Sequence, residues 1–161
     1  KANQQYVGFK IKIVNKFRFE KKSKRFAYYY NQLRLYNLDF AGFKDSTVHD
    51  SVILKNANDN YRVGQLKNII YHQSFRSYSH WIEKINHYSS MQAMDSFQKG
   101  KNPNILKIIF TPTFAFFKAY FIRRYFIYGF DGIFYSYLFS FSRFAKMIKI
   151  RELFQAKNNR E

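Results

Sequence analysis

The chain has 161 residues, of which 47% are hydrophobic and 22% aromatic, and it carries 28 Lys and Arg residues against 10 Asp and Glu residues. This length fits one ordinary domain, and the hydrophobic fraction excludes an intrinsically disordered chain. The lack of cysteine excludes a disulfide scaffold, a Cys-type zinc knuckle and a thiol nucleophile. The net charge of +18 calls for an anionic partner, and nucleic acid, an anionic membrane surface and phosphorylated substrates are the candidates.

The first third of the chain predicts β structure. Residues 5–55 are rich in β-branched and aromatic side chains that partly alternate with lysines, a pattern typical of strands. The basic run at residues 21–25 predicts a solvated loop, and short strands are expected at residues 33–36 and 48–54. The Asn- and Asp-rich segment 56–60 predicts a turn.

From about residue 79 the spacing of apolar residues becomes helical. Ser77 or Ser79 is the expected N-cap of this helix, which should end near Gly100. Pro112 is expected to start the next helix. Amphipathic helices are predicted over roughly 112–128 and 132–154. In the segment 129–132 that joins them, Asp131 is the expected N-cap of the second helix.

The C-terminal part combines aromatic and basic residues. Residues 107–151 hold eight Lys and Arg residues and a single acidic residue, Asp131. Aromatic rings beside a basic face suit an interfacial helix that lies on anionic lipid. The alternatives are that these aromatics form a packed core, or that one face packs on the protein and the other meets lipid. The residues expected at the membrane surface are Lys118, Arg123, Arg124, Arg143, Lys146 and Lys149.

Common catalytic signatures do not occur in this sequence. It contains no P-loop, no Gly-rich dinucleotide turn, no His-Glu-x-x-His and no Asp-x-Asp. One local pairing remains, the sequence VHDSV at residues 48–52, which places a histidine next to a carboxylate. On a strand these two side chains point to opposite faces, so one can face a site while the other is anchored.

Six short motifs occur in a definite order along the chain. They are QLRLY (32–36), VHD (48–50), IIYHQS (69–74), KINHYS (84–89), FFKAY (116–120) and GFDG (129–132). In this order they resemble the C-terminal part of family-2 glycosyltransferases that build the lipopolysaccharide or lipooligosaccharide core, a group that includes β-1,4-glucosyltransferases. The resemblance extends from about residue 6 to residue 155. It implies an α/β fold in which residues 1–106 form the latter part of a GT-A domain with mixed strands. Residues 107–161 would follow as basic, aromatic amphipathic helices for a membrane surface or for packing.

The resemblance also implies a reaction, an inverting transfer of a hexose, most simply glucose, from a nucleotide-sugar to a lipopolysaccharide or lipooligosaccharide core acceptor. Asp50 is the candidate base, and His49 is a candidate metal contact. The candidate contacts to substrate or diphosphate are Arg34, His72, Ser74, Lys84 and Tyr88. The alternatives are a strand-face ion pair for Arg34 and a structural hydrogen bond for His72. For Lys84 and Tyr88 the alternative is helix packing.

In such enzymes the first βαβ units, the uridine-nucleotide pocket and the Asp-x-Asp motif come from the N-terminal half. This chain alone is therefore not expected to bind a sugar nucleotide productively. The complete enzyme is expected to use Mg²⁺ or Mn²⁺ and a UDP-sugar. Its expected partners are the nucleotide-sugar, a lipid-linked oligosaccharide acceptor and an anionic membrane surface, with a peripheral location on the cytoplasmic face of a bacterial inner membrane.

Two other classes of function remain open. One is a non-catalytic membrane-surface protein or a remnant of such an enzyme. The other is a basic nucleic-acid-binding protein, which the high charge and the interleaved aromatics would suit. No RNP, KH or helix-turn-helix pattern supports nucleic-acid binding, and the Phe-rich run at residues 114–117 is typical of a core or a lipid contact.

Overall fold

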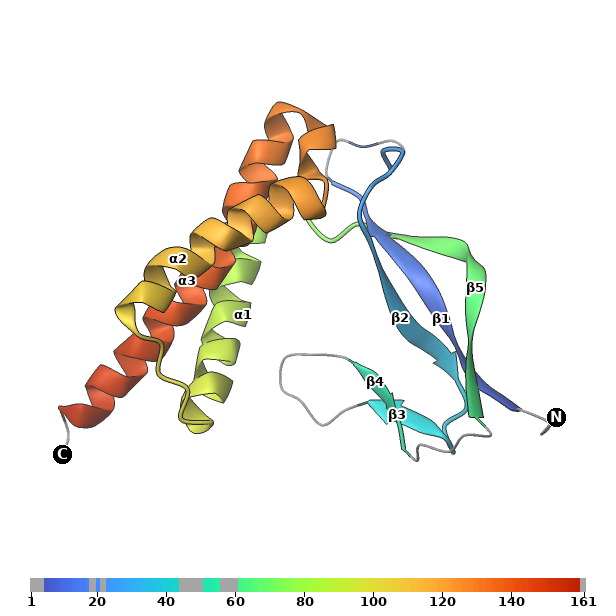
Figure 1. Cartoon of the computed structure of the whole chain (residues 1–161), viewed down its shortest axis with the longest axis horizontal. Helices are drawn as coiled ribbons and strands as arrows, with labels where there is room; N and C mark the ends of the chain where they lie inside the picture. The colour runs from blue at the N-terminus through green and yellow to red at the C-terminus, as the bar shows by residue number, and fades with distance from the viewer. Residues whose placement is uncertain (1–4, 18–19, 21–22, 44–50, 56–60, 160–161) are drawn as a thin grey trace. The chain divides into compact units, whose positions relative to one another are not determined.

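The computed structural model describes residues 5–17, 20, 23–43, 51–55 and 61–159 (Figure 1). The chain divides into two compact units. The β unit comprises Lys1–Ser23 and Tyr29–Ser74, and the helical unit comprises Lys24–Tyr28 and Phe75–Glu161. The predicted boundary at residue 106 divides the chain by expected function and not by contacts between residues, and it stays a prediction.

The β unit is built on a three-stranded sheet with the strand order β2-β1-β5. The central strand β1 (Gln5–Asn15) pairs antiparallel with β2 (Tyr29–Tyr36) and parallel with β5 (Tyr61–His72). β1 takes the central place because its β-branched side chains form the core, where Val7 and Ile13 are at most 5% exposed. The sheet is therefore mixed, as the sequence predicted.

A second, smaller ladder completes the β unit. β3 (Ala41–Phe43) and β4 (Val52–Leu54) pair antiparallel, with Gly42 opposite Ile53. β4 confirms the end of the strand predicted over residues 48–54, whose first residues lie outside the described part of the chain. β5 was not predicted as a strand.

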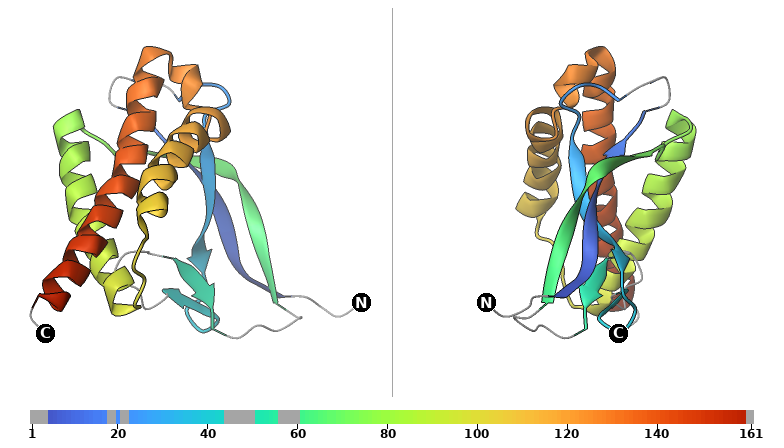
Figure 2. Two further views of the ribbon diagram at one scale, coloured as in Figure 1. Left: turned by 60° about the vertical axis from the view of Figure 1, so that its left-hand side comes forward. Right: turned by 90° about the vertical axis from the view of Figure 1, so that its right-hand side faces the viewer.

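The helical unit contains three long helices, α1 (Tyr78–Gln98), α2 (Ile105–Phe117) and α3 (Phe130–Asn158). α3 packs against both α1 and α2, and the right-hand view of Figure 2 shows it between them. The Ser77 hydroxyl accepts a hydrogen bond from the His80 N–H at 3.0 Å, which confirms the predicted cap of α1.

The start of α2 differs from the prediction. Its N-cap is Asn104, whose side chain accepts from the Lys107 N–H at 2.9 Å, so the helix begins well before Pro112. Pro112 lies inside the helix, and its carbonyl accepts a hydrogen bond from the Ser140 hydroxyl of α3 at 2.7 Å. This contact joins α2 to α3 at the turn where proline lacks a backbone donor.

The predicted helix over 112–128 is also interrupted. α2 continues as a π-helical turn, η1 (Lys118–Ile122), and a separate 3-10 turn, η2 (Tyr125–Tyr128), precedes α3. Arg124, with φ of 58°, reverses the chain between the two turns. α3 is capped by the backbone of Gly129, and Asp131 lies in its first turn, so the prediction of Asp131 as the N-cap was wrong.

Candidate functional site

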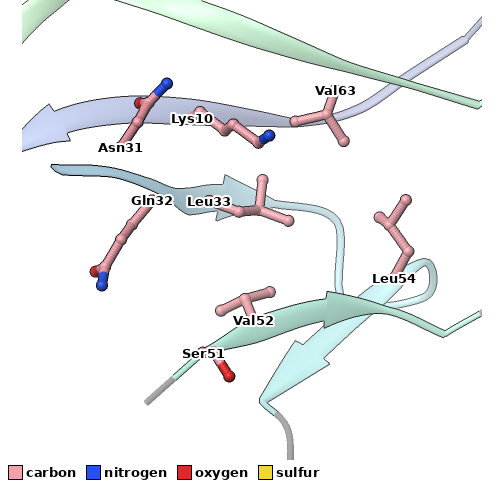
Figure 3. A pocket seen from close by; sticks show the side chains of 8 residues that line it. All are labelled: Lys10, Asn31, Gln32, Leu33, Ser51, Val52, Leu54 and Val63. Atoms are coloured by element: carbon pink, nitrogen blue, oxygen red, sulfur yellow. The ribbon is translucent and has the colours of Figure 1, made fainter. Parts of the chain in front are cut away.

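A pocket in the β unit lies next to the predicted catalytic segment. Asp50 and His49 themselves are outside the described residues. Ser51 and Val52, which directly follow them, line a cavity of about 350 Å³ that also borders β1, β2 and β5 (Figure 3). This volume is that of a small-molecule site. The structure therefore places the neighbours of the candidate base at a cavity.

Polar side chains from the sheet line the same cavity. Figure 3 shows Lys10, Asn31 and Gln32 on the neighbouring strands β1 and β2. The Asn31 amide donates to Gln65 Oε1 at 2.5 Å. Gln32 Oε1 is buried and has no hydrogen-bond partner among the described residues, so a hydroxyl donor from a ligand would satisfy it. Sequence reasoning missed Gln32, because only the fold places it beside Ser51.

A second polar cluster lies where the parallel strands β1 and β5 end. The Ser74 hydroxyl donates to Asn15 Oδ1 at 2.8 Å and lies 2.9 Å from His72 Nδ1. Through these two contacts Ser74 links His72 to Asn15 at the end of β1. Carboxyl ends of parallel strands are the usual ligand side of α/β sheets. His72 is thus in contact with Ser74, and it is also exposed at the edge of the sheet where ligands usually bind.

Arg34 lies away from this cluster. It sits on β2 opposite the irregularity at Phe9 and Lys10 of β1, whereas His72 pairs with Asn15. Five residues of strand separate the two places, a distance of about 17 Å. No ion pair of Arg34 occurs among the described residues. Its charge acts on Tyr30, whose pKa is raised by burial against the opposing effect of Arg34.

Lys84 and Tyr88 belong to the helical unit, one turn apart on α1. The Lys84 ammonium lies 5.9 Å from the centroid of the Tyr88 ring and 5.7 Å from that of Phe75. Tyr88 is 43% exposed. The two side chains therefore form a cation–π pair on the surface of α1, and their contact with substrate stays a prediction.

The KINHYS motif at residues 84–89 has a hydrogen-bond partner in α3 that the sequence did not indicate. The Lys149 ammonium of α3 lies 2.8 Å from the Asn86 carbonyl oxygen, 2.7 Å from Asn86 Oδ1, and 2.9 and 2.8 Å from the hydroxyls of Ser89 and Ser90. Three ammonium protons are shared by four oxygens. Lys149 thus links α3 to α1 through hydrogen bonds.

Three arginines predicted to face a membrane also have partners within the helical unit. Arg123 lies over the rings of Phe139 (4.1 Å) and Tyr28 (5.1 Å), and Arg143 lies 5.0 Å from the same Phe139 ring. Burial, and after it the charge of Arg123, lowers the pKa of Arg143. Arg124 donates to the carbonyl of residue 26 at 3.2 Å. Their membrane role, like that of Lys118 and Lys146, stays a prediction.

A metal site is not assembled by the part of the chain that the structure describes. No group of three or more His, Cys, Asp or Glu residues that could hold a metal ion occurs there. His72 has no such neighbours among the described residues, and His49 is not described. We therefore assign no metal ligand among the described residues.

The fold and its polar pocket define a mixed α/β protein with a candidate small-molecule site. Comparison with known proteins indicates the class of protein that this chain is similar to. The chain is 39% identical over 153 residues to an "uncharacterized glycosyltransferase" of Rickettsia bellii and to one of Rickettsia typhi. It is 38% identical over 159 residues to another of Rickettsia felis.

These matches cover 92% or 96% of this chain but only 52% or 56% of the relatives. The chain thus spans about half the length of the curated relatives it matches. No family model and no solved structure matches it. The chain is similar to one part of proteins named glycosyltransferases, which agrees with the coarser prediction from its motifs.

Proposed function

We propose that this chain forms part of an inverting glycosyltransferase that moves a hexose, most simply glucose, from a nucleotide-sugar to a lipopolysaccharide or lipooligosaccharide core acceptor. The observation that carries the proposal is the 38–39% identity over nearly the whole chain to proteins named glycosyltransferases. The choice of the GT-A fold, the hexose and the core acceptor is supported by the ordered motifs. Mg²⁺ or Mn²⁺ and a UDP-sugar belong to the proposed complete enzyme.

In the proposed reaction Asp50 acts as the general base. Its carboxylate takes the proton of the acceptor hydroxyl, whose oxygen attacks the anomeric carbon of the donor sugar. A glycosidic C–O bond forms as the bond between that carbon and the diphosphate oxygen breaks, and the nucleoside diphosphate leaves. The position of Asp50 directly before Ser51, which lines the 350 Å³ cavity, supports this role.

The decisive experiment replaces Asp50→Asn in the complete enzyme. We expect the transfer rate to fall by roughly 10²–10⁴-fold, the usual contribution of a positioned base, while donor binding is unchanged. Asp39→Asn is the matched control, because Asp39 is an exposed acid of the same unit. Full turnover by the Asp50 variant would remove Asp50 from the mechanism.

We also propose a peripheral location on the cytoplasmic face of a bacterial inner membrane, where the lipid-linked acceptor would be held. The helix over Ile105–Ile122 is long and apolar enough to cross a membrane, and only 17% of it is buried. It packs on the rest of the unit through Ile108, Ala115 and Ala119, while Phe110 and Phe117 are more than half exposed. A helix with one packed side and one apolar exposed side favours an interfacial position.

The same exposed helix favours the second candidate, a non-catalytic membrane-surface protein. The two candidates differ in turnover. The transferase proposal expects the complete protein to release nucleoside diphosphate in the presence of donor and acceptor. If the second candidate is right, the protein binds vesicles but releases no nucleoside diphosphate.

A further inference from the structure

A cavity in the helical unit collects positive charge. It has a volume of about 670 Å³ and lies where the end of α1, the following loop, the first turns of α2 and the second half of α3 meet. Four cations line it, Lys101, Lys107, Arg143 and Lys146, and no acidic residue does. Three separate elements supply these charges, so the cluster is a property of the fold.

None of the four cations has an ion pair or a side-chain hydrogen bond among the described residues. The nearby carboxylate of Asp95 is engaged by Lys99 at 2.7 Å. Burial lowers the pKa of Lys146, and the charge of Arg143 lowers it further. The charge of Asp95 offsets part of this effect on Lys146, but no acid lines the cavity, so its like charges are costly unless an anion occupies it.

The walls of the cavity are ordered by contacts of their own. Arg143 is held at one side by the Phe139 ring. The loop is fixed by the Lys101 N–H, which donates to the Ser96 carbonyl at 2.9 Å, and by the buried Pro103. Asn102 and Thr111 add neutral polar groups to the lining. A guanidinium, three ammonium groups and polar neighbours around one cavity suit an anion with several oxygens.

We propose that this cavity is a binding site for a phosphate monoester or diphosphate group. Phosphate oxygens accept from Arg bidentately and from Lys as a point charge, and a group with two or more negative charges matches the four cations. A soluble phosphorylated molecule and a lipid headgroup share this chemistry. The test of this proposal does not depend on sugar transfer, because phosphate binding is measured without donor or acceptor.

The first experiment measures binding of inorganic pyrophosphate to the purified chain by titration calorimetry. We expect Lys107→Gln and Lys101→Gln each to raise the Kd by about tenfold, the loss of one charge-assisted contact. Lys118→Gln is the matched control, since it removes the same charge from the continuation of the same helix, outside the cavity. Both test positions are exposed, and circular dichroism melting checks that each variant is folded.

A second experiment identifies the source of the phosphate. Vesicles of phosphatidic acid, which carries a phosphate monoester, are compared with vesicles of phosphatidylglycerol, a diester. A preference for phosphatidic acid that Lys107→Gln abolishes supports a lipid headgroup, and loss of pyrophosphate binding alone supports a soluble ligand. The proposal is overturned if pyrophosphate does not bind at millimolar concentration, or if Lys118→Gln weakens binding as much as Lys107→Gln.

Discussion

At the scale of single residues, the Gly-Phe-Asp-Gly motif at 129–132 is explained by backbone geometry. Gly129 has φ of 61° and ψ of −132°, a conformation that is essentially restricted to glycine. A Cβ on Gly132 would overlap the carbonyl oxygen of Tyr125. Asp131 lies between them and accepts a hydrogen bond from the Tyr78 hydroxyl at 3.3 Å. The motif therefore builds the tight entry into α3.

Gly132→Ala tests this role. We expect it to lower the free energy of unfolding by about 2–4 kcal/mol, because the added methyl meets backbone that cannot turn aside. Urea unfolding measures the change. Gly100→Ala is the control: unlike Gly132 it has positive φ, but the space around it is open, so only about 1 kcal/mol is expected. Equal effects of the two variants would show that space at Gly132 does not matter.

Lys149 offers a second residue-scale test. Lys149→Met keeps most of the side-chain volume but leaves the oxygens of Asn86, Ser89 and Ser90 without their ammonium donor. We expect a loss of about 1–2 kcal/mol in the free energy of unfolding, since hydrogen bonds to charged groups are stronger than neutral ones. Arg151→Met, an exposed change two residues further along α3, should have almost no effect. Thermal melts of both variants decide between a structural and a solvated Lys149.

At the scale of elements, local signals determined what could be predicted. The start of α1, expected at Ser77 or Ser79, and its end near Gly100 could be predicted because both signals lie in adjacent sequence. β5 was missed, since its exposed polar positions give no clear alternation and its partner β1 lies far away in the chain. For α2 the proline was given more weight than Asn104, although Asn is a favoured N-cap.

The candidate site was predictable only in part. His72 and Ser74 lie two residues apart, so their contact follows from local sequence. Asn15 joins them through the parallel pairing of β1 with β5, which no local pattern indicates. The charged cavity likewise depends on tertiary packing, because Lys101 and Arg143 come from elements far apart in the chain.

The exposed side of α2 makes an element-scale prediction about lipid. Phe110→Ser together with Phe117→Ser should lower the partition coefficient onto phosphatidylglycerol vesicles by at least about tenfold, because two half-exposed rings no longer enter the interface. Co-sedimentation measures this. Phe43→Ser, an exposed phenylalanine of the β unit, is the control and should leave binding unchanged. Undiminished binding of the double variant would remove α2 from the membrane contact.

At the scale of the whole molecule, basic residues far outnumber acidic ones, which gives the net charge of +18. Aromatic rings and backbone carbonyls hold several cations, as Phe139 does for Arg123. Four further cations line the 670 Å³ cavity, where Lys146 has neighbours of its own sign. Charge repulsion there should lower stability in a way that depends on pH.

Lys146→Gln makes this dependence measurable. Burial lowers the pKa of Lys146 in the folded state below the 10.5 of an ordinary lysine, so the folded protein binds fewer protons than the unfolded chain in the window just below pH 10.5. The loss of stability caused by burying the charged Lys146 is fully present at neutral pH. It disappears as the pH rises through the pKa of Lys146 in the folded state. The variant should therefore be more stable than the parent at pH 7, by a few tenths of a kcal/mol after solvent screening, with the difference shrinking towards pH 10.5. Urea midpoints of both proteins across this range measure it.

Lys118→Gln is the control, because it lowers the net charge equally but lies outside the cavity. It should not reproduce the pH-dependent difference. If it did, the effect would come from the overall charge of the protein.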